Sequence, residues 1–291
     1  NNLDVETTVH WHGLRLENRF DGVPDVTQEP VQPGESFEYE LLFPDPGIYW
    51  YHPHVREDYQ QELGLYGIIF VNPTDSDQFN EVNKEEVFVI DDILLEGDDV
   101  PDFDKEYTNL ALMGRFGNTM LINGETNYIV NVNKGDVVRF YLINVANTRT
   151  FNIEVPNAKI KLVGSDGGLY EREEFVDSII IAPAERYIIE VLFEKEGEYQ
   201  IMNVNPLKSY VLGEVIVSDE MTNNDLSDNF NNLKENAKTK AEIEQYKAYF
   251  DKMPDVTMKL SIDMSGMHGG MMAGMMQDHE DGIEWEDTMA M

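Results

Sequence analysis

The chain has 291 residues and a formal net charge of −35, from 56 acidic and 21 basic side chains. This acidic balance excludes nucleic acid as a partner, because phosphate binding needs a basic surface. The hydrophobic content of 42% is that of an ordinary folded protein, and the sequence has no apolar run long enough to span a membrane. The absence of cysteine excludes disulfides, thiolate catalysis and cysteine metal sites within the chain.

Residues 4–70 consist of short strand-like runs separated by turns. The alternation of apolar and polar side chains in FEYELLF (37–43), with the Pro-Gly and Asp-Pro-Gly breaks, predicts antiparallel β structure. The stretch VREDYQQELG (55–64) is the exception and is predicted to form a helical turn or a loop. The pattern indicates part of a β-sandwich.

A second block of strand-like runs extends from residue 86 to residue 218, with Gly, Asn and Asp at its turns. Residues 97–120 are predicted to form a longer connection within this block. Several short strands at such spacing favour a sandwich or a barrel. The length of the chain agrees with about two domains, each large enough to bury a core.

Residues 222–254 have apolar side chains at helical spacing, with Asn224 or Asp225 positioned as a cap. The apolar positions are Leu226, Phe230, Leu233 and Ala237, followed by Ile243, Tyr246 and Phe250. We predict one or two linker helices in this segment.

The last segment begins as a strand and continues into a tract of Met, Gly and His. Nine of the 14 methionines lie between residues 258 and 291. Thioether sulfur is a soft ligand that selects Cu(I), and His268 and His279 could join it. A flexible low-complexity loop with adaptable apolar side chains is an equal alternative.

Four of the six histidines form two His-x-His pairs, in HWHG (10–13) and WYHPH (50–54). In an extended strand the two histidines of a pair project to the same face, roughly 7 Å apart. A single pair could be two half-buried imidazoles bonded to carbonyls. Two pairs, each next to Trp or Tyr, favour a shared metal site, although imidazole suits Zn, Cu, Fe and Ni alike.

Three stretches around these pairs contain a family pattern, namely TVHWHGLRL, FDGVPDVTQEPVQPGESFEYEL and GIYWYHPHVREDYQQELGLYGIIFV. They resemble the amino-terminal cupredoxin domain of the multicopper oxidases, the laccase and cuprous oxidase family. Four later stretches resemble the middle cupredoxin domain of that family, namely LINGE, GDVVRFYLINVANTRTFNIEV, LVGSDGGLY and APAERYIIEVLF. The resemblance extends over nearly the whole chain.

The resemblance implies an all-β fold: two consecutive cupredoxin-like Greek-key β-sandwiches or barrels, plus a helical linker and a Met-rich tail. The domains expected from it are residues 1–74 for the first, which lacks its amino-terminal strands, and 85–218 for the second. Residues 219–254 would be the helical linker. Residues 255–291 would begin a third cupredoxin domain with a Met-rich loop.

In the family, four His-x-His motifs hold a trinuclear copper cluster that reduces oxygen to water, and a separate type 1 copper takes electrons from the substrate. By resemblance, His10 binds the type 2 copper. His12 and His52 bind one copper of the type 3 pair, and His54 binds the other. Pairs on neighbouring strands can serve a cluster instead of a single ion.

Asp21 lies in the FDGVP turn, where the family has an acid near the cluster. A carboxylate there can orient an imidazole or a copper-bound water and relay protons to reduced oxygen. The alternative is a plain Asp-Gly turn residue. We favour the catalytic acid.

The chain departs from the family in its missing type 1 site, which needs a cysteine thiolate with two histidines. The family supplies that cysteine and the other two His-x-His motifs from a third cupredoxin domain. We therefore expect an internal piece of a longer oxidase, inactive by itself, whose partners are oxygen, the missing third domain and a small reducing substrate.

The substrate is either phenolic or Cu(I), and the Met-rich tract favours Cu(I) oxidation and copper tolerance. By family the protein is expected to be extracellular, at the cell surface or periplasmic. The alternative function is a non-catalytic copper-binding cupredoxin pair that needs a partner chain.

Overall fold

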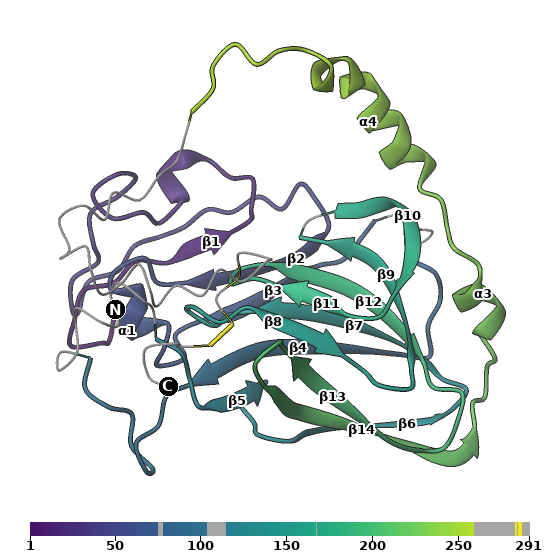
Figure 1. Cartoon of the computed structure of the whole chain (residues 1–291). Helices are drawn as coiled ribbons and strands as arrows, with labels where there is room; N and C mark the ends of the chain where they lie inside the picture. The colour runs from purple at the N-terminus through teal and green to yellow at the C-terminus, as the bar shows by residue number, and fades with distance from the viewer. Residues whose placement is uncertain (75–77, 104–114, 167, 259–282, 284, 287–291) are drawn as a thin grey trace, which may run out of the picture.

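The computed structural model describes residues 1–74, 78–103, 115–166, 168–258, 283 and 285–286. The chain forms two strand-rich units that pack against each other (Figure 1). We call residues 1–74 the first unit and residues 84–221 the second unit. Among the described residues no helix is long and apolar enough to cross a membrane.

The first unit contains an antiparallel sheet of order β1-β2-β3. Its elements are β1 (His10–His12), η1 (Asn18–Phe20), β2 (Gly47–His52), α1 (Glu57–Gln60) and β3 (Gly67–Val71). The short helix α1 confirms the helical turn predicted after the second histidine pair.

The strand predicted over FEYELLF (37–43) is wrong, because these residues adopt no regular structure. Side-chain alternation cannot show whether a neighbouring strand is available, and no described residue forms a ladder with this segment. Phe37 and Phe43 are both 40% exposed, so the apolar face of the segment is only partly covered. Tyr39 fixes the segment instead, since its hydroxyl accepts from Val9 N and donates to Gln28 Oε1.

The second unit is a sandwich of two sheets, which confirms the all-β prediction. One sheet has six strands in the order β10-β9-β12-β7-β4-β5, and the other has five in the order β11-β8-β13-β14-β6. Their bounds are β4 (Lys84–Ile93), β5 (Thr119–Ile122), β6 (Tyr128–Lys134), β7 (Val137–Asn144), β8 (Phe151–Glu154), β9 (Lys159–Ser165), β10 (Gly168–Val176), β11 (Ile179–Ile181), β12 (Arg186–Leu192), β13 (Gly197–Val204) and β14 (Ser209–Met221).

The core of the second unit lies between its two sheets. Phe88 and Phe140 project from the six-stranded sheet, and Phe151, Ile201 and Val215 project from the other, all at most 2% exposed. Every residue of β7 is buried, because its second face is covered as well. The long connection expected over residues 97–120 is present in its described parts up to β5, and residues 104–114 lie outside the described chain.

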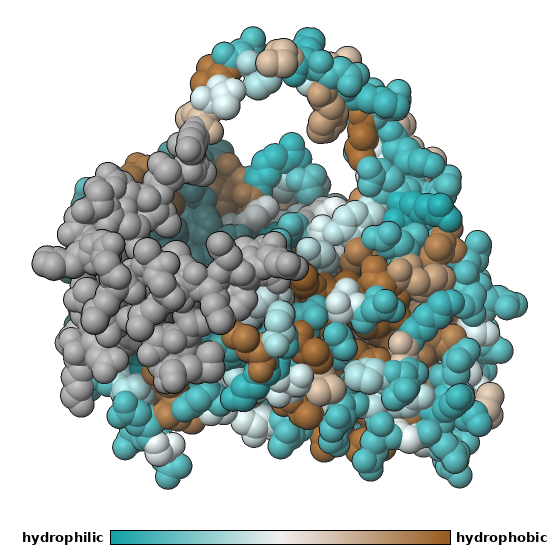
Figure 2. All heavy atoms as spheres, in the orientation of Figure 1, coloured by the Kyte–Doolittle hydropathy of each residue, from teal (hydrophilic) through white to brown (hydrophobic). Residues whose placement is uncertain are grey.

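Two helices follow the second unit, α3 (Ser227–Asn231) and α4 (Ala237–Phe250). Leu226 and Phe230 are buried against the sandwich, as the spacing predicted, and Asp225 accepts a hydrogen bond from Ser227 N. The predicted apolar face does not continue into a buried face, because α4 has no buried residue. The segment with α4 arches over the body and leaves an open gap beneath it (Figure 2). The Met-rich tract, His268 and His279 lie outside the described residues.

The two units share an apolar junction. Ile48 and Trp50 of β2 pack against Tyr141, Ile143 and Ile188 of the six-stranded sheet. This contact covers the second face of β7 and supports the strand that contains His52. The junction therefore couples the first unit's sheet to the sandwich.

A buried acidic pair lies beside this junction. Glu62 accepts from Asn147 Nδ2 at 3.0 Å, and Asp91 accepts from the Tyr66 hydroxyl at 2.8 Å. Burial raises the pKa of each carboxyl, Glu62 and Asp91, to about 7. Each unit thus supplies one acid to a shared interior.

Arg149 is the centre of a second buried polar cluster, within the second unit. Its side chain is 1% exposed, with Nε 2.6 Å from Asp92 Oδ2 and Nη1 2.9 Å from Glu286 Oε1. Asn205 and Tyr210 also donate to Glu286. Residues 285–286 are therefore docked into the sandwich although they lie far along the chain from it.

Candidate metal centre

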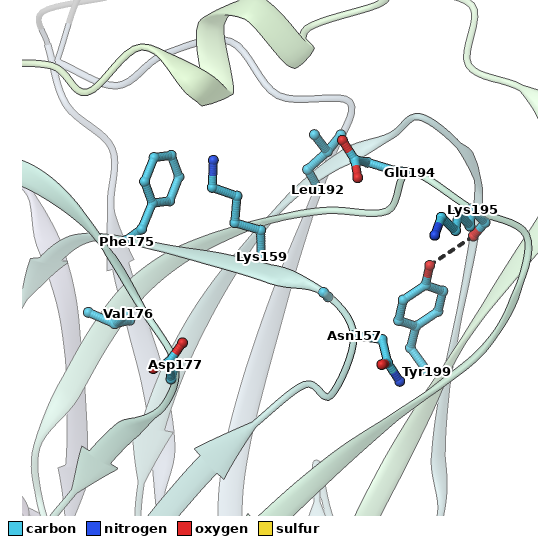
Figure 3. Close-up of a pocket in the computed structure, with 10 residues that line it drawn as sticks. Asn157, Lys159, Phe175, Val176, Asp177, Leu192, Glu194, Lys195 and Tyr199 are labelled. Carbon is cyan, nitrogen blue, oxygen red and sulfur yellow. Dashed lines mark hydrogen bonds between the residues drawn. The ribbon is translucent and has the colours of Figure 1, made fainter.

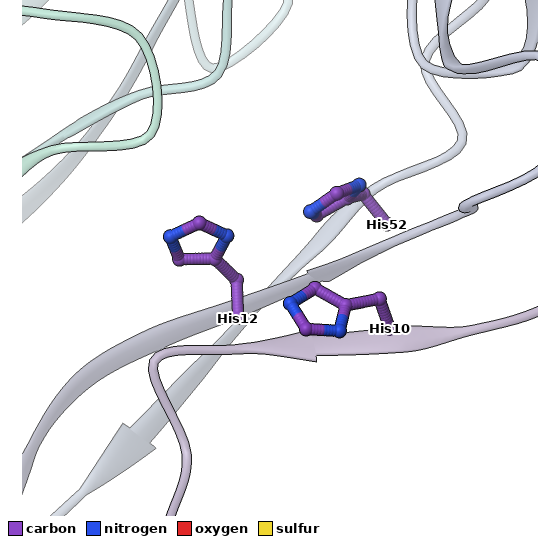
Figure 4. Close-up of side chains that lie close together, drawn as sticks. All are labelled: His10, His12 and His52. Atoms are coloured by element: carbon purple, nitrogen blue, oxygen red, sulfur yellow. The ribbon is translucent and has the colours of Figure 1, made fainter. Parts of the chain in front are cut away.

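Three of the four paired histidines form a compact cluster. Within β1, His10 and His12 project to the same face, and the antiparallel register places His52 of β2 directly opposite His10. One ligand atom from each of the three imidazoles lies within 4.8 Å of the other two. The rings occupy a common space beside the two strands (Figure 4).

His54 lies at the edge of this cluster. Its ring centroid is 5.3 Å from that of His10 and 6.0 Å from that of His52. His54 follows Pro53, beyond the end of β2, and its Nδ1 is 2.9 Å from Glu57 Oε1 at the start of α1. The structure therefore brings all four predicted ligands together, with three in the tightest group.

Main-chain carbonyls orient two of the imidazoles. His10 Nδ1 lies 2.7 Å from Asp21 O, and His52 Nδ1 lies 2.9 Å from Pro53 O. A carbonyl accepts only, so each Nδ1 donates and each Nε2 is left with its lone pair free. His52 Nε2 is buried and has no hydrogen-bond partner among the described residues. These residues fit a metal such as copper, which imidazole nitrogen binds well.

Asp21 contacts the cluster through two of its oxygens. Its carbonyl is the closer one to His10, while its carboxylate Oδ1 lies 3.4 Å from His10 Nδ1. Gly22 follows with φ +75°, and a Cβ there would lie 1.9 Å from Val9 O. Only glycine allows this close approach, so the Asp-Gly pair fixes the position of Asp21 beside β1.

Two imidazoles of the cluster have lowered pKa values. The pKa of His12 is lowered to about 4, first by burial and then by the nearby charges of Arg186, His10 and His54. Burial is also the largest cause that lowers the pKa of His52 to about 4. Both imidazoles are therefore neutral at pH 7, which is the form that binds metal.

Trp50 shares the ligand face of the sheet. Its ring stacks on His52 with a centroid separation of 4.2 Å and contacts His12 at 5.3 Å. Trp11 and Tyr51 contact each other at 5.7 Å, as cross-strand partners. From the sequence, Glu57 is considered as a neighbour of the site but a solvated loop is favoured, whereas its carboxylate lies 2.9 Å from His54 Nδ1. The sequence gave no signal for Arg186.

A concave site away from the histidines lies on the second unit. It has a volume of about 420 Å³ and is lined by Lys159, Phe175 and Tyr199, among others (Figure 3). Two of its polar side chains already have partners, since Tyr199 donates to Lys195 O and Lys159 donates to Asn231 Oδ1. These contacts occupy two of the groups that could otherwise bind a ligand.

Two family models described as multicopper oxidase match residues 1–76 and 95–219, which together are more than half of the chain. The chain belongs to the multicopper oxidase family.

Known relatives agree with this assignment. Copper resistance protein A of Escherichia coli is 26% identical over 242 residues, covering 68% of this chain and 39% of the relative. Multicopper oxidase mco of Staphylococcus aureus is 26% identical over 239 residues, covering 77% of this chain and 50% of the relative. The chain thus spans half or less of the length of these relatives.

Solved structures of the family have the same fold. The multi-copper oxidase from Pseudomonas thermotolerans is 30% identical with a TM-score of 0.67, over 77% of this chain and 54% of that one. Lac15 from a marine microbial metagenome is 32% identical with a TM-score of 0.61, over 77% and 55%. The predicted cupredoxin-like β-sandwich fold is confirmed.

Proposed function

We propose that this chain supplies copper ligands to an oxidase that couples one-electron oxidation of a reducing substrate to the reduction of oxygen to water. The substrate is phenolic or Cu(I). The observation that supports this most directly is the group of His10, His12 and His52, whose ligand atoms lie within 4.8 Å of one another. Copper, when bound there, would supply the electron transfer to oxygen.

Within this proposal each histidine has its own part. His10 binds the type 2 copper, His12 and His52 bind one type 3 copper, and His54 binds the other. The Nδ1 contacts of His10, His52 and His54 hold their rings with Nε2 free. Asp21 orients His10 and can exchange protons with solvent, since its side chain is 34% exposed.

The domain organisation belongs to the same proposal. Residues 1–74 and 85–218 are two cupredoxin domains, 219–254 the linker, and 255–291 the start of a third domain. A type 1 copper needs a cysteine thiolate, and this chain has none. Electrons must therefore enter from outside these 291 residues, and the chain alone does not turn over. The family favours an extracellular, cell-surface or periplasmic location.

The ligand assignment is tested by Cu(II) titration of the purified chain, followed by electron paramagnetic resonance. We expect nitrogen-ligated Cu(II) in the wild type and its loss in the double variant His10→Ala/His52→Ala. The matched control is His268→Ala/His279→Ala, which removes the two histidines outside the His-x-His motifs. Equal nitrogen-ligated Cu(II) in the wild type and in His10→Ala/His52→Ala contradicts the proposal.

A non-catalytic copper-binding cupredoxin pair remains a second candidate, favoured by the absence of cysteine. The two functions differ in their response to a third cupredoxin domain of the family, added in trans with copper. Oxygen consumption with a phenol or Cu(I), together with intense blue absorption, supports the oxidase. Stable assembly without oxygen consumption supports the binding function.

A further inference from the structure

Arg186 connects the second unit to both histidine-bearing strands. It is the first residue of β12, and its residue exposure is 5%. Its Nε donates to Ile48 O of β2 at 3.0 Å. On the other strand, its Nη2 lies against Gly13, the residue that follows His12.

The contact with Arg186 requires glycine at position 13. A Cβ at Gly13 would lie 2.5 Å from Arg186 Nη2 and 3.4 Å from the Tyr49 ring. Gly13 also has φ +83°, and the turn closes with Leu14 N donating to Trp11 O. The glycine of HWHG thus lets the chain turn and lets the guanidinium approach the end of β1.

Residues of the second unit also contact the Arg186 guanidinium. Asp166 Oδ1 lies 2.8 Å from Arg186 Nη1, and Ala184 O accepts from the same nitrogen at 3.2 Å. The backbones are paired too, since Asp166 N donates to Arg186 O at 2.8 Å. These contacts within the second unit fix the orientation of the planar guanidinium.

The contact lies where the β1–β2 ladder ends. The last pair of that ladder is His12 with Trp50, and Gly13 and Ile48 lie beyond it. In this region no further backbone pairing sets the separation of the two strands. The Arg186 guanidinium contacts both chain segments there. It meets Gly13, which follows His12, and Ile48, which lies two residues before Trp50.

We propose that Arg186 is a positioning residue of the second unit, which sets the place of His12 relative to His10 and His52 by bridging the ends of β1 and β2. This inference rests on the proposed function, in which His12 binds copper. The copper site is then assembled by both units, although its ligands all come from the first. Changing Arg186 alters the geometry of the bound copper without removing any ligand.

The test is Cu(II) titration with electron paramagnetic resonance on Arg186→Met and Arg186→Lys. We expect both variants to bind Cu(II) about 10-fold more weakly, with changed hyperfine parameters, as for other residues that orient ligands. Lysine keeps the charge but cannot reproduce the planar fork. Wild-type affinity and spectrum in Arg186→Lys overturn the positioning role.

A pair of glycine variants tests the same contact and leaves Arg186 unchanged. Gly34 has the same φ of +83° as Gly13, but a Cβ at Gly34 meets nothing within 4 Å. We expect Gly13→Ala to change the Cu(II) spectrum and Gly34→Ala to leave it unchanged. Equal spectra overturn the inference. This pair decides the question if the Arg186 variants fail to fold.

His12→Ala separates this inference from the proposed function. If His12→Ala leaves Cu(II) affinity and spectrum unchanged, His12 is not a ligand and the proposed function fails. If His12→Ala weakens binding while Arg186→Lys binds Cu(II) as the wild type does, only the positioning role fails. Tyr66→Phe is the control for general loss of a contact between the units, and we expect its Cu(II) spectrum to match the wild type.

Discussion

The two units of this chain differ in content: the first contains the candidate metal ligands, and the second contains most of the buried core. In the first unit, the described residues 1–74 bury four hydrophobic side chains, namely Phe20, Ile48, Tyr49 and Trp50. The second unit buries a continuous core between two sheets and several charged groups with their partners. The candidate ligands are all in the unit with the smaller interior.

This difference shows how a site can be rigid on a small sheet. Two of the four buried side chains of the first unit, Ile48 and Trp50, belong to a core cluster that they share with the second unit. Gln61 donates to Val145 O across the same boundary at 2.8 Å. The sandwich therefore stabilises the strands that contain the histidines, and a change in either unit should affect a different property of the chain.

The largest expected effect is on stability, at Arg149 of the second unit. Arg149→Met leaves the buried Asp92 carboxylate without its cation, which costs about 3–5 kcal/mol. Arg15→Met is the matched control in the first unit, since the Arg15–Asp45 pair is exposed and is worth less than about 1 kcal/mol. The free energy of unfolding, measured with urea, should separate the two variants. Similar losses would show that the second unit does not dominate stability.

The next effect is on metal binding, at Gly22 of the first unit. Gly22→Ala forces the chain away from Val9 O and moves the Asp21 carbonyl off His10. We expect Cu(II) affinity to fall about 10- to 100-fold, as for other ligand-orienting contacts. Gly64→Ala, with φ +85° and no atom within 4 Å of a Cβ, is the control and should keep wild-type affinity.

A third prediction concerns pH and the acidic pair at the junction. Burial raises the pKa of Glu62 and of Asp91 to about 7, so the folded state binds protons that the unfolded state has released. Their contribution to stability is therefore full below about pH 4 and is lost as the pH rises through 7. We compare urea unfolding of the wild type with that of Glu62→Gln and Asp91→Asn across this range.

In the wild type, both carboxyls make the free energy of unfolding fall as the pH rises. Each amide variant lacks one of them, so its free energy of unfolding should change less steeply with pH, by up to about 1.4 kcal/mol per pH unit. Because the histidines are the same in all three proteins, their own titration cancels in the difference. The variants should become less stable relative to the wild type as the pH falls from 7 to 5. If they instead become more stable relative to it, the two carboxyls are not buried in a shared interior.

The smallest expected effect is at α4. Phe250 is 81% exposed, so Phe250→Ala should change the free energy of unfolding by less than about 0.5 kcal/mol. Phe230→Ala is the matched variant on α3, where the ring is 1% exposed, and it should cost about 3–5 kcal/mol. A large loss at Phe250 would indicate that α4 contributes to the stability of the sandwich.

The sequence predicted that the paired histidines lie together, because the signal for this is local. The two-residue alternation of a strand places His10 and His12 on one face whatever the rest of the chain does. The register that sets His52 opposite His10 depends on long-range pairing, which composition and spacing do not encode. Asp21 was predicted through its carboxylate, yet its carbonyl is the closer contact to His10.

The failures have the same cause. FEYELLF has the alternation of a strand but no described partner strand, and α4 has apolar spacing but no surface to cover. Arg186 reaches Gly13 from more than 170 positions away in the chain. A sequence pattern indicates which side chains share a face of a segment, whereas only the folded chain shows which other segment packs against that face.

The carbonyls that accept from His10 and His52 also bear on how such a site can change during evolution. No side-chain substitution at Asp21 or Pro53 removes a main-chain oxygen, so the tautomer of each ring is inherited from the path of the backbone. The ligand set is thereby tolerant of point mutations in its surroundings. It is vulnerable mainly where that path depends on one residue type, as it does at Gly22.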